Sequence, residues 1–270
     1  MTISLPTILA LDFDGVICDG LVEYFQTAWH AYCQVWNVDE STPPAGLAEA
    51  FYRLRPVVET GWEMPLVLRA LVTGVTEAEI LQDWPTIAQA EIAASHCQPR
   101  DLALAVDGYR DQWIARDLQH WLDQHRFYPG IVERLHHLLT SPVQLLIITT
   151  KEGRFVRELL HQQSITLEDD RIIGKEYQRP KHESLRQVLT ANPQAVIWFV
   201  EDRLKTLLNI KQYPDLDAVQ LFLADWGYNT AAERELAQRD DRIHLLSLAT
   251  VAQDMGMWPH LSEESKERDS

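Results

Sequence analysis

Two aspartates stand one residue apart directly after an apolar stretch near the start of the chain. The stretch "TILAL" leads into Asp12 and Asp14, and a glycine follows at once in "DFDG". Residues two apart on an extended chain lie on the same side, so both carboxylates are expected to face one way. Carboxylates that meet repel each other unless a cation joins them, and Mg²⁺ is held by one or two carboxylates with waters and phosphate oxygens. The pair therefore favours a magnesium site over a polar turn at the end of a strand.

Polar residues also follow two later apolar runs. The run "VQLLII" leads into Thr149 and Thr150, and the run "AVIWFV" leads into Glu201 and Asp202. In an open parallel sheet, ligands bind beyond the carboxyl ends of the strands. If these runs are neighbouring strands, their hydroxyls and carboxylates converge with the first pair of aspartates on one crevice.

These residues have to be positioned by strands and helices, and the pattern of apolar runs alternating with helical segments predicts an α/β core. This core is expected to be a Rossmann-like parallel sheet with helices on both faces. Buried strands are expected in five apolar runs, near residue 10, at 143–150, at 195–202, at 218–225 and near residue 245. Helical patterns alternate with the last four runs, at roughly 152–163, 181–191, 203–212 and 230–238.

A long segment after the first strand breaks this alternation and predicts an inserted all-helical cap domain over residues 20–126. Apolar residues recur there at helical spacing, as in Val22, Phe25 and Trp29, and no strand pattern appears. The turn "YPG" marks the return to the sheet. We expect residues 1–19 and 127–260 to form the catalytic core and residues 261–270 to form a polar, flexible tail.

The composition indicates a folded, acidic protein. Hydrophobic residues make up 46% and charged residues 24% of the 270 residues, as in globular proteins. The formal charge of −16 argues against a nucleic-acid partner. No apolar run approaches the roughly 18 residues of a membrane span, and the first residues lack a secretory signal pattern. Three cysteines at unrelated spacings predict a reducing, cytoplasmic setting, and nothing in the sequence indicates an oligomeric state.

Four segments, taken in order, resemble the motifs of the haloacid dehalogenase (HAD) superfamily. They are "LALDFDGVICD", "LIITTKEGRF", "RPKHESL" and "IWFVEDR". With a helical insertion after the first motif, the chain is similar to the phosphoglycolate-phosphatase-like branch, over roughly residues 7–20 and 127–250. The resemblance implies a magnesium-dependent phosphatase, a HAD-like phosphoric monoester hydrolase. Its substrate would be a small phosphorylated metabolite, hydrolysed through an aspartyl-phosphate intermediate.

The resemblance also assigns roles to the first and third motifs. Asp12 would be the nucleophile, and Asp14 would protonate the leaving alcohol and later activate water. Lys181 would stabilise the charge of the aspartate and the phosphoryl oxygens. Arg179 could be aligned in its place, because it forms an Arg-Pro pair where the family has Lys-Pro.

The phosphate-binding hydroxyl of the second motif corresponds to Thr149, with Thr150 beside it, at the amino end of a helix whose N–H groups attract anions. Arg154 is interpreted as a solvated helix residue, and Lys151 is open between that and a role in the site. In the insertion, Arg53, Arg55 and Trp62 are candidates for contact with the substrate, or else belong to a surface loop with a buried tryptophan.

The expected metal ligands are Asp12, Asp14, Asp202 and Glu201. Glu201 stands where the family often has glycine, so its ligation is open between a direct contact and one through water. Two other functions stay open: a phosphomutase of the same superfamily, and a non-catalytic binding or regulatory protein on this fold. Clustered carboxylates argue against the latter, because burying charge without a function is costly.

Overall fold

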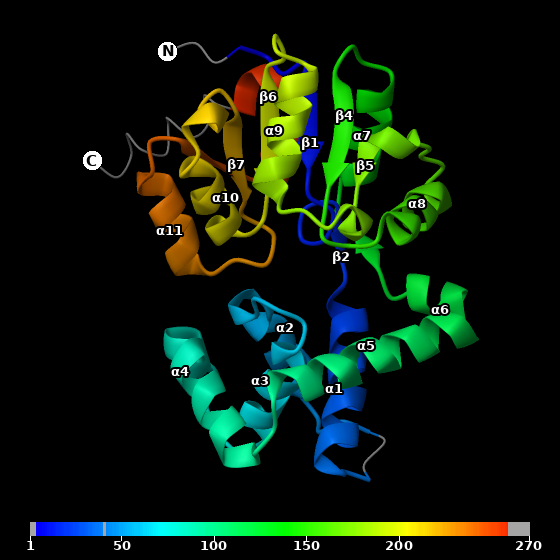
Figure 1. The fold of residues 1–270 in the computed structure, drawn as a ribbon, viewed down its shortest axis with the longest axis vertical. Helices are drawn as coiled ribbons and strands as arrows, with labels where there is room; N and C mark the ends of the chain where they lie inside the picture. The colour runs from blue at the N-terminus through cyan, green and yellow to red at the C-terminus, as the bar shows by residue number, and fades with distance from the viewer. Residues whose placement is uncertain (1–3, 40–41, 259–270) are drawn as a thin grey trace. The chain divides into compact units, whose positions relative to one another are not determined.

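A computed structural model describes residues 4–39 and 42–258 of the chain, and the predicted tail at 261–270 lies outside them. The chain forms two compact units (Figure 1). The described parts of residues 1–19 and 126–270 form one, here called the core unit, and those of residues 20–125 form the other, here called the insertion. None of the described helices combines the length and the apolar character that crossing a membrane requires.

The core unit is built on a six-stranded sheet in the order β5-β4-β1-β6-β7-β8, and every neighbouring pair of strands is parallel. This confirms the predicted Rossmann-like sheet, with the five expected runs as its long strands. β5 was not expected, because two residues are too few to show a period. The strands are β1 (Ile8–Leu11), β4 (Gln144–Ile148), β5 (Ile172–Ile173), β6 (Ile197–Glu201), β7 (Gln220–Ala224) and β8 (Ile243–Leu246).

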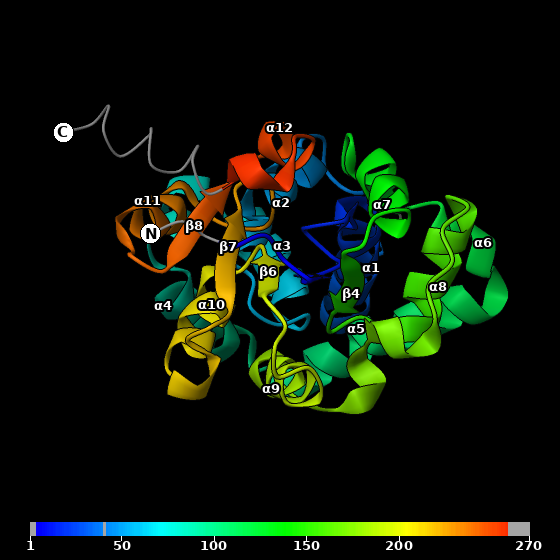
Figure 2. The ribbon, with the colours of Figure 1, turned by 90° about the horizontal axis from the view of Figure 1, so that it is seen from above.

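Helices cover both faces of this sheet, as Figure 2 shows for α9 and α10 on one face and α7 and α12 on the other. Alternate side chains of β1 serve the two faces, since successive strand residues point in opposite directions. Ile8 and Ala10 belong to the apolar core shared with α9 and α10, whereas Leu9 and Leu11 line a small apolar cavity with α7. The helices are α7 (Ile131–Leu139), α8 (Gly153–Gln162), α9 (Lys181–Ala191), α10 (Leu204–Lys211), α11 (Ala231–Arg239) and α12 (Leu248–Val251).

The register of the central strands brings three polar strand ends together. Leu11 pairs with Ile147 on one side and with Val200 on the other. Asp12 and Glu201, which directly follow Leu11 and Val200, therefore lie side by side at the carboxyl edge of the sheet, and Thr149 lies two residues beyond Ile147 at the same edge, where parallel sheets bind ligands.

A short antiparallel ribbon marks the two points at which the chain passes between the units. It consists of β2 (Cys18–Asp19) and β3 (Arg126–Phe127), with Cys18 opposite Phe127 and Asp19 opposite Arg126. The Phe127 ring packs edge-on against Phe13, with ring centroids 6.3 Å apart. The chain leaves the core unit after β2 and returns to it at β3. Strands of two residues carry no periodicity, so the sequence did not predict this ribbon.

Helices are the only regular secondary structure in the described residues of the insertion, which confirms the predicted all-helical architecture. Phe25, Trp29, Phe51 and Trp84 are buried in its own apolar core. The helices are α1 (Leu21–Trp36), α2 (Leu47–Leu54), α3 (Glu63–Val72), α4 (Glu77–Ser95), α5 (Pro99–Arg116) and α6 (Leu118–Leu122).

Candidate active site

Asp12 lies directly after the central strand β1, at the start of a tight loop. Its backbone N–H continues the sheet by donating to the Val200 carbonyl at 2.9 Å. The loop turns because the Phe13 carbonyl accepts from the N–H groups of Ile17 and Cys18, both at 2.9 Å. The Phe13 N–H donates to Asp12 Oδ1 at 2.7 Å. The Asp12 carboxylate is therefore held in one orientation by its own loop.

Lys181, the first residue of α9, carries the cation that meets this carboxylate. Its Nζ lies 2.7 Å from Asp12 Oδ2 and 2.7 Å from Glu201 Oε2. The alternative cation, Arg179, instead lies over the Tyr177 ring, 4.9 Å from its centroid, and its Nε has no hydrogen-bond partner among the described residues. Of the two candidates for the third motif, the structure places the lysine at Asp12.

Three carboxylates from two neighbouring strand ends form a buried group, here called the acidic cluster. Asp12, Glu201 and Asp202 each offer an oxygen, and these oxygens lie within 4.8 Å of one another. Glu201 Oε1 accepts from the Arg203 N–H at 3.0 Å, and Asp202 Oδ2 accepts from the Tyr228 N–H at 2.8 Å. All three carboxylates are therefore oriented by bonds to the protein.

Burial dominates the electrostatics of the acidic cluster. It raises the pKa of Asp12 to about 7, against the opposing effect of Lys181 and with a smaller contribution from Glu201. Burial also raises the pKa of Glu201 and of Asp202. Burial disfavours the Lys181 ammonium, but the Asp12 and Glu201 carboxylates outweigh it and raise the pKa of Lys181. One ammonium faces three carboxylates, so the ionised cluster has an excess of negative charge that an oxygen-binding divalent cation matches.

This electrostatic state predicts how the stability of the metal-free protein depends on pH. The pKa of Asp12 is higher in the folded chain, at about 7, than its ordinary value of 3.8. Its contribution to stability is therefore present at low pH and is lost as the pH rises through about 7. We expect Asp12→Asn to raise the melting temperature of the metal-free protein at about pH 8 and to raise it much less at about pH 5, by differential scanning fluorimetry.

A carboxylate with the opposite shift provides the control for that measurement. Hydrogen bonds from Lys211 and from two backbone N–H groups overcome the effect of burial and hold the pKa of Asp240 below its ordinary value. Asp240→Asn should therefore gain no stability at about pH 8. An Asp12→Asn effect that is the same at both pH values would contradict the shift assigned to Asp12.

The Asp14 carboxylate lies outside the acidic cluster and pairs with Lys151 instead. Lys151 Nζ lies 3.1 Å from Asp14 Oδ1 and 3.5 Å from Oδ2. The Lys151 side chain is only 9% exposed, so it is not a solvated helix residue, and α8 begins two residues later, at Gly153. Arg154, by contrast, is exposed and pairs with Glu152. The sequence did not predict that Lys151 would be the charge partner of Asp14, because the two residues lie 137 positions apart.

The structure corrects the expected setting of Thr149. Thr149 is buried, and its Oγ1 accepts from the Lys151 N–H at 3.1 Å, while Thr150 is exposed. Thr149 does not lie at the amino end of a helix, because α8 begins only at Gly153. The Gly153 N–H donates to Glu176 Oε2 at 3.0 Å, so a carboxylate of the protein already occupies the position at which the helix would attract an anion.

The two candidate arginines of the insertion have partners within the insertion. Arg53 forms a bidentate pair with Glu77 at 2.8 and 2.7 Å and is well exposed. Arg55 donates to the Val58 carbonyl at 3.1 Å and lies over the Tyr24 ring, 5.0 Å from its centroid. Their contact with a substrate stays a prediction.

A turn after β7 encloses Asp202, and sequence reasoning gave it no chemical role. A side chain at Gly227 would place its Cβ 2.2 Å from Asp202 Cβ, and one at Gly15, where φ is +88°, would come 2.1 Å from Asp202 Oδ2. Both positions therefore require glycine. The Trp226 indole donates to the Val16 carbonyl at 3.2 Å, which fastens this turn to the loop that carries Asp12. The signal was present in "ADWGYNT", but only the fold brings that segment beside Asp202.

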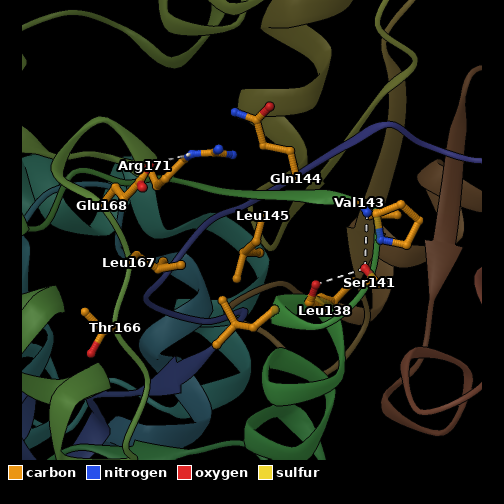
Figure 3. Close-up of a pocket in the computed structure, with 11 residues that line it drawn as sticks. Leu138, Ser141, Val143, Gln144, Leu145, Thr166, Leu167, Glu168 and Arg171 are labelled. Atoms are coloured by element: carbon orange, nitrogen blue, oxygen red, sulfur yellow. Dashed lines mark hydrogen bonds and ion pairs between the residues drawn. The ribbon is translucent and has the colours of Figure 1, made fainter.

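A cleft of about 500 Å³ elsewhere in the core unit contains none of the predicted site residues (Figure 3). It lies around the start of β4, at the edge of the sheet opposite the acidic cluster. Its turn is held by Ser141, which donates to the Leu138 carbonyl at 2.9 Å and accepts from the Val143 N–H at 3.2 Å. The cleft is therefore separate from the candidate active site.

Solved structures of other proteins share this architecture. A haloacid dehalogenase-like hydrolase from Streptococcus pneumoniae superposes with a TM-score of 0.56 at 17% identity, covering 90% of this chain and 94% of that one. A predicted phosphatase from Clostridium acetobutylicum gives 0.55 at 15% identity, covering 98% of this chain and all of that one. The chain has the HAD-like fold. A predicted phosphoglycolate phosphatase from Haemophilus somnus gives 0.50 at 13% identity, covering 91% and 95%.

These likenesses extend over nearly the whole of each chain, so the HAD-like fold includes the insertion and not the sheet alone. No protein-family model matches the sequence, and no curated protein matches it significantly. At 13–17% identity, the similarity is one of fold. The chemistry has to be argued from the side chains themselves.

Proposed function

We propose that this protein is a magnesium-dependent phosphatase that hydrolyses a small phosphorylated metabolite. The observation that carries the proposal is the position of Lys181, 2.7 Å from Asp12 at the carboxyl edge of the sheet and next to two further buried carboxylates. A buried aspartate needs a reason to be there, and a nucleophile held between a cation and a metal site supplies one. The HAD-like fold of known hydrolases supports the same conclusion.

Asp12 is the proposed nucleophile. Its Oδ1 is held by the Phe13 N–H and its Oδ2 by Lys181, so that the carboxylate is oriented before the substrate arrives. Attack on phosphorus forms an O–P bond to Asp12 and breaks the bond to the leaving alcohol. Water then attacks the aspartyl-phosphate, releases inorganic phosphate and regenerates the carboxylate.

Asp14 is the proposed general acid and base. It gives a proton to the leaving alcohol oxygen in the first step and takes one from the attacking water in the second. Lys151 holds the Asp14 carboxylate at 3.1 Å in the structure and so orients it. We further propose that Thr149, Thr150 and the two arginines of the insertion contact the substrate.

The acidic cluster fits Mg²⁺, because its donors are carboxylate oxygens that carry an excess of negative charge. Asp12 and Asp202 would hold the ion, whereas the Asp14 carboxylate, predicted as a further ligand, pairs with Lys151 outside the acidic cluster and serves the proposed acid and base role. Glu201 already receives Lys181 and the Arg203 N–H, so it suits a contact through water as well as a direct one. When bound, Mg²⁺ would offset the charge of the carboxylates and of the phosphoryl oxygens. Lys181 contributes to the same end, because its ammonium lies 2.7 Å from Asp12 Oδ2.

The decisive experiment incubates the purified protein with a panel of cellular phosphate esters, with and without millimolar Mg²⁺, and measures free phosphate. We expect release that depends on Mg²⁺ and is abolished by a chelator. Conversion of a hexose phosphate to its isomer without free phosphate would indicate a phosphomutase instead. Binding of a metabolite without turnover across the panel would indicate a non-catalytic protein. Either result would overturn the proposal.

A further inference from the structure

Tyr228 connects the acidic cluster to a part of the fold that carries no proposed chemistry. Its backbone N–H donates to Asp202 Oδ2 at 2.8 Å, and its hydroxyl donates to Asp19 Oδ1 at 2.9 Å. The hydroxyl of Tyr128 is hydrogen-bonded to the Tyr228 side chain as well. Tyr228 is only 5% exposed. One buried residue therefore binds the proposed metal ligand through its backbone and two further residues through its side chain.

The backbone around Tyr228 is fixed by several hydrogen bonds, so that its bond to Asp202 and the bonds of its side chain cannot change independently. The Tyr228 carbonyl accepts from Arg203 Nη1 at 2.8 Å. The next residue, Asn229, donates its amide to the Asp202 carbonyl at 2.9 Å and to the Ala224 carbonyl at 2.8 Å. On the other side, Gly227 packs against Asp202 with no room for a Cβ. A shift of the Tyr228 ring therefore moves the peptide that orients Asp202, because the turn has little freedom to absorb it.

The two side-chain partners of Tyr228 belong to the two strands of the ribbon. Asp19 is the last residue of β2, and Tyr128 directly follows β3. The chain enters the insertion after the first of these strands and returns from it at the second. Both connections to the insertion thus start from residues tied to Tyr228.

We propose that Tyr228 is a positioning residue that couples occupation of the acidic cluster by a divalent cation to the rigidity of the ribbon β2–β3. A cation that draws in Asp202 fixes the Tyr228 peptide, and the ring then fixes Asp19 and Tyr128. By thermodynamic linkage the effect is reciprocal, so that an ordered ribbon strengthens cation binding by the same factor. The proposal rests on the metal site of the proposed function. It adds that this site, through Tyr228, stiffens the two ribbon strands at which the chain leaves and re-enters the core unit.

Hydrogen–deuterium exchange of the full-length protein, with and without Mg²⁺, tests the coupling. The reporters are the ribbon amides of Cys18 and Tyr128, which donate to Phe13 and Ile17. In the wild type, Mg²⁺ should slow their exchange by roughly 5-fold or more, within the usual range of coupling between sites. In Tyr228→Phe, which keeps the backbone bond to Asp202 and loses the hydroxyl, Mg²⁺ should still slow exchange around β6 but no longer in the ribbon.

A residue with a merely structural role would give a different result. Tyr228→Phe would then speed ribbon exchange equally with and without Mg²⁺ and leave the Mg²⁺-dependent difference unchanged, which would overturn the coupling. Asp19→Asn removes the charge from the residue that accepts the hydrogen bond of the Tyr228 hydroxyl. It should reduce the Mg²⁺-dependent difference in ribbon exchange while Tyr228 itself is unchanged. Tyr177→Phe, at an exposed tyrosine of the core unit, is the matched control and should behave as the wild type does.

Isothermal titration of Mg²⁺ separates failure of this proposal from failure of the metal site. A wild-type protein that binds no Mg²⁺ would overturn the metal site on which the coupling rests. A wild-type protein that binds Mg²⁺ without any change in ribbon exchange would overturn the coupling and leave the metal site intact. If the coupling holds, Tyr228→Phe should weaken Mg²⁺ binding by the same factor as that by which the ribbon loses protection.

Discussion

Asp12→Asn should abolish phosphate release, with a loss of roughly 10⁴-fold or more in kcat, as for other enzymes that lose their nucleophile. An amide is a poor nucleophile and cannot form the aspartyl-phosphate. The replacement keeps the size of the side chain and leaves an oxygen for the Phe13 N–H, so the loop should keep its shape. The measurement is the Mg²⁺-dependent hydrolysis of an aryl phosphate under saturating conditions, followed by release of the coloured phenol.

The matched control is Asp215→Asn, which removes an exposed carboxylate from a surface pair with Arg186. This variant should turn over at the wild-type rate, since exposed ion pairs contribute little and Asp215 lies outside the candidate site. Wild-type turnover by Asp12→Asn would show that another residue receives the phosphoryl group.

Lys181→Met should lower both the activity and the stability of the protein. The lysine is the shared partner of two buried carboxylates, and its removal leaves them without their cation. Removing one partner of a buried ion pair costs about 3–5 kcal/mol of stability. The loss of positioned charge beside the phosphoryl group should reduce kcat by roughly 10²-fold or more. Urea unfolding of the metal-free protein measures the loss of stability, and the aryl phosphate assay measures the loss in kcat.

Lys211 offers a close comparison, because it also meets two carboxylates, those of Asp240 and Asp241, but its side chain is 25% exposed, against 12% for Lys181. Lys211→Met should cost about 0–1 kcal/mol and leave turnover unchanged. The double variant Lys181→Met/Glu201→Gln should recover part of the lost stability, since it removes one of the two unpaired carboxylates, without recovering activity. Equal losses for the two lysine variants would contradict the role assigned to burial at Lys181.

The fold was predictable from the sequence because each long strand of the core is a continuous apolar run. Such runs are typical of parallel strands buried on both faces, and all five were found where they were expected. Polar residues at their ends marked the carboxyl edge of the sheet, which explains why Asp12, Glu201 and Asp202 could be expected to meet. In the insertion, apolar residues that recur at helical spacing likewise predicted helices.

What the sequence did not predict depends on short elements and on contacts between distant segments. The ribbon β2–β3 has too few residues for a pattern, and its pairing joins Cys18 to Phe127 across the whole insertion. Lys151 follows a strand end, but its pairing with Asp14 depends on the adjacency of β1 and β4. The place of Tyr228 depends in the same way on β6 lying beside β7. Local composition contains none of this information.

The antiparallel pairing of Asp19 with Arg126 means that the insertion begins and ends at adjacent residues. Two antiparallel residues in direct register are the ends that a two-residue hairpin turn joins. A gene in which such a turn replaces residues 20–125 would therefore encode the core unit alone, with β2 and β3 joined as a hairpin. The same junction is also the place at which a foreign helical module could be grafted in place of the insertion.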